Sequence, residues 1–257
     1  MSSPRVAVIV PARMASSRFP GKPLSPIAGL PMVEHVRRRA ALATIVDEVH
    51  VATCDREIRD AVEAFGGSVI MTAATHLDCT DRVEEASRSL AADIILMVQG
   101  DEPLLDPSLL ARLVDPLIRD SSLGCTNLLS VIYDRSDRDN PDVVKAATAL
   151  DASLMFLSRA PIPHERREGR SPWLRQTGMS AFRRGMLTRY AGLEPTPLEL
   201  TEAVGFLRLL ENGIPILGVV TERGTVGVDR LDDVPRVEAL LRDDPVEASL
   251  LSKITAP

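Results

Sequence analysis

The chain has 257 residues, of which 45% are hydrophobic, 26% are charged and only 3% are aromatic, and its formal net charge at pH 7 is −6. So few aromatic residues argue against a base-stacking platform for single-stranded nucleic acid, and the acidic balance gives no general attraction to DNA or to an anionic membrane. An anionic ligand would therefore need a local cluster of cations.

Apolar, β-branched segments alternate with amphipathic segments in the first half of the chain. Apolar residues recur at three- and four-residue spacing in residues 32–43, 56–67 and 79–91, which predicts helices. The alternation predicts an α/β fold with a Rossmann-like, mainly parallel central sheet flanked by helices. The expected buried strands are Val6–Val10, Val49–Thr53, Val69–Met71, Ile94–Val98 and Thr126–Val131.

The pattern changes after Ser130. Residues 143–163 are expected to form a small β-ribbon subdomain, and residues 170–193 a strand that enters a helix. Residues 197–213 have the spacing of one periodic helix, and a strand and a final helix follow in residues 214–229 and 230–244. No linker is evident, so we predict a single domain over residues 1–257.

The cysteines give no sign of a disulfide framework or a zinc site. Cys54, Cys79 and Cys125 lie far apart and form no C-x-x-C pair. We also find no basic-then-apolar leader and no apolar run of about 18 residues. The expectation is a cytoplasmic protein that has no membrane segment.

A cationic loop follows the first expected strand. After Pro11 the chain places Arg13, Arg18 and Lys22 among small residues. In a parallel sheet, ligands bind beyond the carboxyl ends of the strands, and guanidinium groups bind phosphate oxygens bidentately. The G-x-G-x-x-G and G-x-x-x-x-G-K-[ST] fingerprints are absent, which disfavours hydride transfer and Walker-type sites. The loop predicts a polyphosphate site, with a solvated basic loop as the alternative.

Carboxylates follow two later strands. Asp101 and Glu102 come directly after the buried run Ile94–Val98, and Asp229 ends the segment "GTVGVD". Such positions can hold Mg²⁺ against nucleotide phosphates. The alternative at Asp101 and Glu102 is a turn that caps the next helix. Together with the cationic loop, these acids make a metal–nucleotide site plausible.

Seven motifs occur in a family-specific order: "PARMASSRFPGKPL", "GLPMVEH", "VATCD", "VQGDEP", "SRAPIP", "PLE" and "GVD". As a set they resemble the sugar-activating nucleotidyltransferases, most closely the CMP-KDO synthetase type (3-deoxy-manno-octulosonate cytidylyltransferases), from Val6 to about Arg242. The resemblance implies CTP as donor, Mg²⁺ as cofactor and a homodimer. It also implies that residues 1–130 bind CTP, and that residues 131–257 bind the acceptor and form the dimer.

The resemblance assigns roles by position in these motifs. The catalytic positions are Arg13, Lys22, Asp101 and Asp229, of which Asp101 and Asp229 would be the magnesium ligands. The nucleotide-binding positions are Pro11, Ala12, Arg13, Ser17, Arg18, Lys22, His76, Thr80, Arg82 and Gln99. On the acceptor side, the resemblance matches Arg159 to a cation. Arg175, Gln176 and Arg183 complete the expected acceptor-binding positions as candidate partners of an anionic acceptor, with surface charge as the alternative for the three arginines.

Three segments depart from the family pattern. "HLDCTDR" has Asp78 and Cys79 where the family usually has Ser and Gly, and the roles of these two residues are left open. "RQTGMSAFR" has Gln176 for a His and Ser180 for a Tyr, and residues 205–206 are Gly-Phe where the family usually has Glu-Gln. Unpaired buried polar groups cost about 1–3 kcal/mol each, so these changes together predict a different acceptor.

These observations lead to a predicted reaction. An acceptor oxygen attacks the α-phosphorus of CTP in line and pyrophosphate leaves, with catalysis by positioning and charge neutralisation. An ionised phosphonate or carboxylate needs no general base, so we predict a small anionic acceptor such as phosphonoformate. The alternatives are a CMP-KDO synthetase acting on 3-deoxy-manno-octulosonate or a related sugar acid, another nucleotide donor, and a non-catalytic nucleotide-binding protein.

Overall fold

The computed structural model describes residues 3–15, 19–76, 78–167, 169–222 and 226–255. The chain divides into two compact units. The first contains residues 1–111 and 225–257, and the second contains residues 112–224. The first unit is therefore built from both ends of the sequence.

The first unit is organised around parallel strands in the order β6-β1-β4-β5. Every residue of β1 and β6 is buried, which explains why these strands are continuous apolar runs without alternation. Val8 of β1 lies opposite Val49 on one side and Leu96 on the other. The strands are β1 (Val6–Pro11), β4 (Glu48–Thr53), β5 (Ser68–Met71) and β6 (Ile94–Val98).

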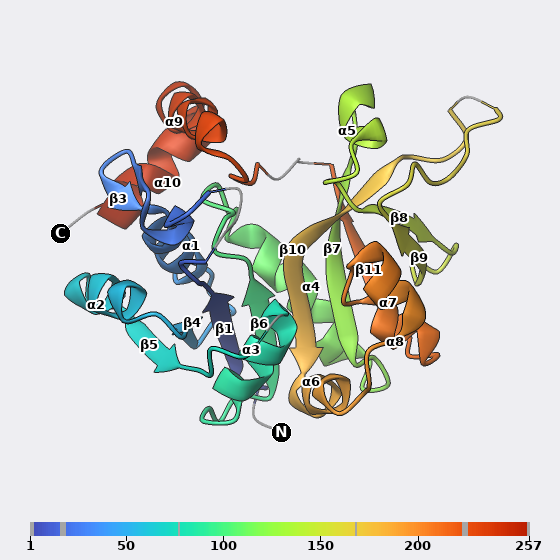
Figure 1. Ribbon diagram of the computed structural model, residues 1–257, viewed down its shortest axis with the longest axis horizontal. Helices are drawn as coiled ribbons and strands as arrows, with labels where there is room; N and C mark the ends of the chain where they lie inside the picture. Colours follow the sequence, from blue (N-terminus) through green and yellow to red (C-terminus); the bar gives the residue numbers. More distant parts are fainter. Residues whose placement is uncertain (1–2, 16–18, 77, 168, 223–225, 256–257) are drawn as a thin grey trace. The chain divides into compact units, whose positions relative to one another are not determined.

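The C-terminal helices pack against the N-terminal part of this unit. Figure 1 shows α9 and α10, in red, beside α1 and β3, in blue. Ile27 and Met32 share an apolar cluster with Val228, Val237 and Leu241. The remaining elements are η1 (Lys22–Leu24), β2 (Pro26–Ile27), β3 (Leu30–Pro31), α1 (Met32–Ala40), α2 (Arg56–Ala64), α3 (Cys79–Ser87), η2 (Leu231–Asp233), α9 (Val234–Asp243) and α10 (Pro245–Thr255). Helix α4 (Ser108–Arg119) runs across the boundary between the units.

The second unit is mainly antiparallel. β10 pairs antiparallel with β7 and β8, β8 pairs antiparallel with β9, and β11 pairs parallel with β7. Its strands are β7 (Cys125–Val131), β8 (Lys145–Thr148), β9 (Leu154–Ser158), β10 (Leu174–Arg183) and β11 (Leu217–Thr221). Its helices are α5 (Arg135–Asp139), α6 (Arg184–Ala191), α7 (Pro197–Glu202) and α8 (Leu207–Glu211). In the part of the chain that the structure describes, no helix is long and apolar enough to cross a membrane.

The predicted fold class and the five predicted strands are confirmed, as is the β-ribbon, which is β8 and β9. The assignment of binding roles to residues 1–130 and 131–257 stays a prediction, and the compact units have other boundaries.

One predicted helix is wrong. Residues 197–213 form α7 and α8 in place of one helix, because Ala203 takes a left-handed conformation with φ of 51° and ends the first helix. Arg208 of α8 reaches back to Glu199 of α7 at 2.5 Å in a buried ion pair, which stabilises the broken arrangement. The prediction also missed α10, because it ended the last helix at Asp244.

A buried ion pair fastens α10 to α1. Arg39 Nη1 lies 2.7 Å from Glu247 Oε2, and Arg39 is fully buried. The same nitrogen donates to the carbonyl oxygen of Leu105 at 3.3 Å. A buried charge that loses its partner is costly, so the attachment of the C-terminal helix depends on this pair.

Replacing Glu247 with alanine is expected to lower the free energy of unfolding by about 3–5 kcal/mol, because Arg39 would keep a buried charge without its partner. Urea denaturation measures the loss. The control is Asp243→Ala, because Asp243 pairs with Arg242 on the exposed surface and should contribute less than about 1 kcal/mol. Equal losses for the two variants would show that the buried pair has no special role.

Candidate nucleotide and metal site

A cavity of about 380 Å³ lies in the first unit, where β1 and β6 end. It brings together positions that are far apart in the sequence. The predicted nucleotide-site residues that line it are Pro11, Ala12, Arg13, Lys22, His76, Arg82, Gln99 and Asp101. Ser17 and Arg18, which were predicted to bind the nucleotide, lie outside the described residues.

The loop after β1 is held in place by backbone contacts. Asp55 accepts a hydrogen bond from Met14 N–H at 2.7 Å, and Gly21 donates to the carbonyl oxygen of Met14 at 3.2 Å. Gly21 has φ of 72°, a conformation that favours glycine. These contacts place Lys22 at the edge of the cavity, whereas Arg13 is exposed there. Sequence reasoning missed Asp55, although it stands in the quoted motif "VATCD".

Lys22 joins three segments of the chain. Its Nζ lies 2.7 Å from Asp101 Oδ2, 2.9 Å from the carbonyl oxygen of Val228 and 4.0 Å from Asp229 Oδ1. The two predicted metal ligands therefore converge on one ammonium group. Gly100, next to Asp101, lies so close to β1 that an added Cβ would sit 3.2 Å from the carbonyl oxygen of Pro11. The small residue allows the loop after β6 to approach the end of β1.

Asp101, Asp229 and the carbonyl of Val228 make an oxygen-only donor set, which suits a hard cation such as Mg²⁺. Mg²⁺ usually takes one or two carboxylates from the protein and fills its other positions with phosphate oxygens and water. Two converging carboxylates fit that requirement. Among the described residues, no group of three or more His, Cys, Asp or Glu side chains forms a metal site of the all-protein type.

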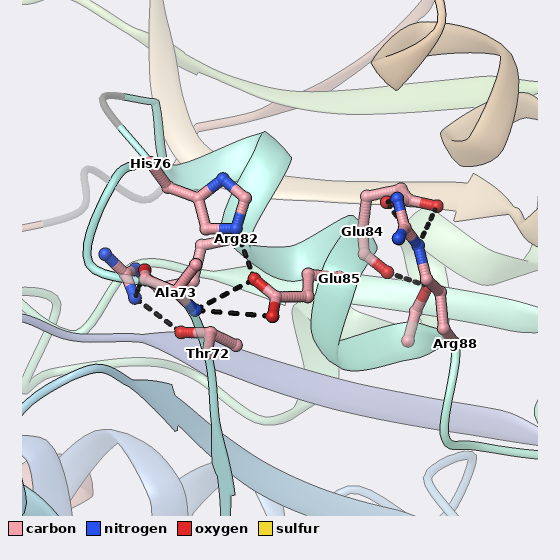
Figure 2. A network of polar contacts seen from close by, with 8 residues as sticks. Thr72, Ala73, His76, Arg82, Glu84, Glu85 and Arg88 are labelled. Atoms are coloured by element: carbon pink, nitrogen blue, oxygen red, sulfur yellow. Dashed lines mark hydrogen bonds and ion pairs between the residues drawn. The ribbon is translucent and has the colours of Figure 1, made fainter.

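Arg82 supplies a further, buried cation at the cavity. Only 3% of the residue is exposed, and its Nη1 donates to Thr72 Oγ1 and, at 3.3 Å, to the carbonyl oxygen of Ala73. Figure 2 shows the contact with Thr72. Both acceptors are neutral, so an anionic ligand group in the cavity would complement the buried guanidinium.

His76 is positioned by Glu85. Its Nε2 lies within hydrogen-bond distance of Glu85 Oε2, which also accepts from Ala73 N–H at 3.0 Å (Figure 2). Burial alone would raise the pKa of Glu85, but the hydrogen bonds from His76 and Ala73 outweigh it and lower the pKa. The ionised carboxylate therefore fixes both the imidazole and the strand end beside it.

The departures at Asp78 and Cys79 have a structural account. Asp78 caps α3 by accepting from Thr80 N–H at 2.6 Å. Thr80, which was predicted to bind the nucleotide, is buried and is not among the residues that line the cavity. Gln99 Nε2 donates to Cys79 Sγ at 3.1 Å. Burial of the thiol, and then the charge of Asp78, raise the pKa of Cys79 to about 12. The raised pKa favours the neutral thiol, which lies beside Gln99 at the cavity.

The predicted acceptor residues lie in the second unit, where contacts within the protein occupy two of them. Arg159 donates to the carbonyl oxygens of Glu202 at 2.7 Å and of Pro141 at 2.9 Å. Arg183 donates to the carbonyls of Leu117, Leu123 and Asp120, which lie at or just after the end of α4. These bonds give both arginines a structural role, and their role in acceptor binding stays a prediction without support from these contacts.

The other two predicted acceptor residues are neighbours on β10. Arg175 donates to Ser130 Oγ at 3.0 Å, and Gln176 pairs in register with Leu129 of β7. Both are half-buried. Their role in acceptor binding also stays a prediction.

Comparison with known proteins identifies the family. Residues 7–217 match the sequence profile of the family described as Cytidylyltransferase. The chain is a cytidylyltransferase. The nucleotidyltransferase activity predicted from the sequence motifs is thereby confirmed at the level of the family.

The relatives of this cytidylyltransferase cover nearly all of it. It is 42% identical to the 3-deoxy-manno-octulosonate cytidylyltransferase of Geobacter metallireducens over 91% of this chain and 96% of that one. It is 45% identical to the enzyme of the same name from Myxococcus xanthus over 94% and 98%. A solved structure of CMP:2-keto-3-deoxy-manno-octonic acid synthetase complexed with CTP has a TM-score of 0.88 and 36% identity, over 93% of this chain and 99% of that one.

The hydrogen bonds of Glu85 predict a pH dependence. Because its folded-state pKa lies below the ordinary 4.5, the carboxylate stabilises the fold above about pH 4.5, and this contribution is lost as the pH falls through the folded-state pKa. Glu85→Gln should therefore lower the melting temperature at pH 6 and have a smaller effect at pH 3. Thermal unfolding followed by circular dichroism measures both.

The control for this variant is Glu57→Gln, an exposed position on α2. Its effect should be small at both pH values. If Glu85→Gln lowered the melting temperature equally at pH 6 and pH 3, the ionised carboxylate would not be the stabilising group.

Proposed function

We propose that this cytidylyltransferase transfers CMP from CTP to 3-deoxy-manno-octulosonate or a closely related sugar acid, with Mg²⁺ as cofactor and release of pyrophosphate. The relatives with this name at 42% and 45% identity, and the similar structure complexed with CTP, support this reading. The observation that carries it is the convergence of Asp101, Asp229 and Lys22 at the edge of a cavity lined by further cations.

The residues of the cavity suit a nucleoside triphosphate. Arg13, Lys22 and Arg82 would neutralise the phosphate oxygens, and the buried guanidinium of Arg82 would do so with little screening by water. Gln99, beside Cys79, and His76, held by Glu85, present polar groups for the nucleoside. Water exclusion and fixed positions strengthen such contacts in the transition state.

Asp101 and Asp229 would hold Mg²⁺, which when bound supplies Lewis-acid polarisation of a phosphoryl oxygen. Without a bound nucleotide, Asp101 orients Lys22, because the ammonium donates to this carboxylate. The acceptor oxygen would attack the α-phosphorus in line, and the cations of the loop after β1 would stabilise the charge on the leaving pyrophosphate.

A second candidate acceptor is the small phosphonate predicted from the sequence, and one observation favours it. Phe206 packs against Phe182 with ring centroids 5.7 Å apart, and both are buried. Buried Ser180 accepts from Asn127 Nδ2 at 2.9 Å. At Ser180 and Phe206, the resemblance implies polar groups that bind a sugar acid. In this chain these two residues instead make contacts within the second unit. The names of the relatives give the phosphonate no support, so it ranks second.

Two further parts of the proposal rest on the sequence. The resemblance implies a homodimer, which sedimentation velocity measures, and the cysteine pattern favours a cytoplasmic location.

Pyrophosphate release with a panel of acceptors tests the proposal. With CTP and Mg²⁺, we expect turnover with 3-deoxy-manno-octulosonate at least tenfold faster than with phosphonoformate. Turnover with phosphonoformate alone would reverse the ranking of the two acceptors. In a thermal-shift assay with Mg²⁺, CTP should stabilise the protein more than UTP, ATP or GTP, because the family transfers cytidylyl groups.

Asp101→Asn is expected to lower kcat by about 100-fold or more, because it removes a metal-holding carboxylate and the partner of Lys22. The matched control is Asp232→Asn, an exposed carboxylate in η2 close in sequence to Asp229, which should change kcat less than about twofold. Unchanged turnover in Asp101→Asn would remove the support for the metal assignment.

A further inference from the structure

The position of Lys22 raises a question about the order of binding. Its ammonium occupies the space where the two predicted metal ligands converge, 2.7 Å from Asp101 Oδ2 and 4.0 Å from Asp229 Oδ1. The side chain is only 15% exposed, whereas those of Asp101 and Asp229 are 30% and 52% exposed. The protein's own cation is thus the most buried of the three groups.

A divalent ion held by the same carboxylates would lie close to this ammonium. Like charges repel strongly in a partly buried site, because water screens them poorly. Lys22 and a divalent ion therefore compete for the same oxygens. A hydrogen bond from the ammonium to the carbonyl oxygen of Val228, at 2.9 Å, further stabilises Lys22 in this position.

Lys22 also lines the cavity that Arg13 and Arg82 line. A lysine carries a compact charge on a flexible four-carbon stem, so its ammonium can exchange one anionic partner for another without movement of the backbone. A phosphate group in this cavity would offer such a partner. Gly21 and the contacts of Met14 fix the backbone from which the side chain would swing.

We propose that Lys22 couples nucleotide binding to metal binding. Its ammonium pairs with Asp101 and Asp229 until nucleotide phosphates give it another partner, so a divalent ion binds tightly only together with the nucleotide. This inference rests on the proposed Mg²⁺–CTP site. By thermodynamic reciprocity, bound metal then favours the nucleotide by the same factor as nucleotide favours the metal.

Binding of Mn²⁺ to the full chain without nucleotide, followed by electron paramagnetic resonance of the free ion, tests the proposal. Lys22→Met should bind Mn²⁺ at least tenfold more tightly than the wild type, because the competing cation is gone. Lys22→Arg, which keeps the charge, should stay within threefold of the wild type. Lys253→Met, which removes an exposed lysine of α10, controls for net charge and should change nothing.

The same titration with saturating CTP measures the coupling. The ratio of Mn²⁺ affinities with and without CTP should be at least tenfold smaller in Lys22→Met than in the wild type, and chelation of Mn²⁺ by CTP in solution cancels between the two. If circular dichroism shows that Lys22→Met is misfolded, the neutral and polar Lys22→Gln carries the same prediction.

The possible failures are distinguishable. Equal Mn²⁺ affinity of the wild type and the neutral variants, without nucleotide, would overturn the role of Lys22 and leave the proposed metal site standing. Absence of Mn²⁺ binding in every variant at millimolar concentration, with and without CTP, would overturn the metal site itself.

Discussion

The ion pair between Lys22 and Asp101 is the constraint on which the site depends. It joins residues 79 positions apart in the sequence, and the hydrogen bond from Lys22 to Val228 spans 206 positions. The loop after β1, the loop after β6 and the segment that precedes α9 meet at one ammonium group. Because that segment belongs to the same compact unit as β1, the return of the chain's C-terminal part completes the site.

Much of the fold follows from the sequence, since strands buried on both faces must be continuous apolar runs. The carboxyl ends of β1 and β6 are predictable from where the apolar runs end. Arg13 and Lys22 lie in the loop after β1, and Asp101 lies in the loop after β6. The break between α7 and α8 was not predictable, because the apolar spacing continues through Ala203 whereas its backbone is left-handed.

The site residues that the sequence analysis missed contribute by positioning other groups or through their backbone atoms. Asp55 positions a backbone N–H, Val228 contributes a carbonyl oxygen, and Glu85 of α3 orients His76, which precedes that helix. None of these contributions has a signature in residue type or spacing. Conversely, Arg159 and Arg183 have the residue type that binds anions, yet their guanidinium groups bond to backbone carbonyls.

The two units differ in what their side chains indicate about function. In the first, named cations and carboxylates surround one cavity, which matches the chemistry of the cytidylyltransferase family. In the second, Phe182 and Phe206 pack together and Ser180 is bonded to Asn127, whereas the curated relatives are named for a sugar acid. The packing in the second unit and the names of the relatives therefore point to different acceptors, whereas both agree with a cytidylyltransferase.

A crystal structure with CTP and Mg²⁺ bound tests the central claim most directly. The account predicts that the triphosphate lies against the loop after β1, with the metal ion held by Asp101 and Asp229 and with the Lys22 ammonium turned to a phosphate oxygen. A triphosphate bound elsewhere, or a metal ion that neither carboxylate touches, would contradict it.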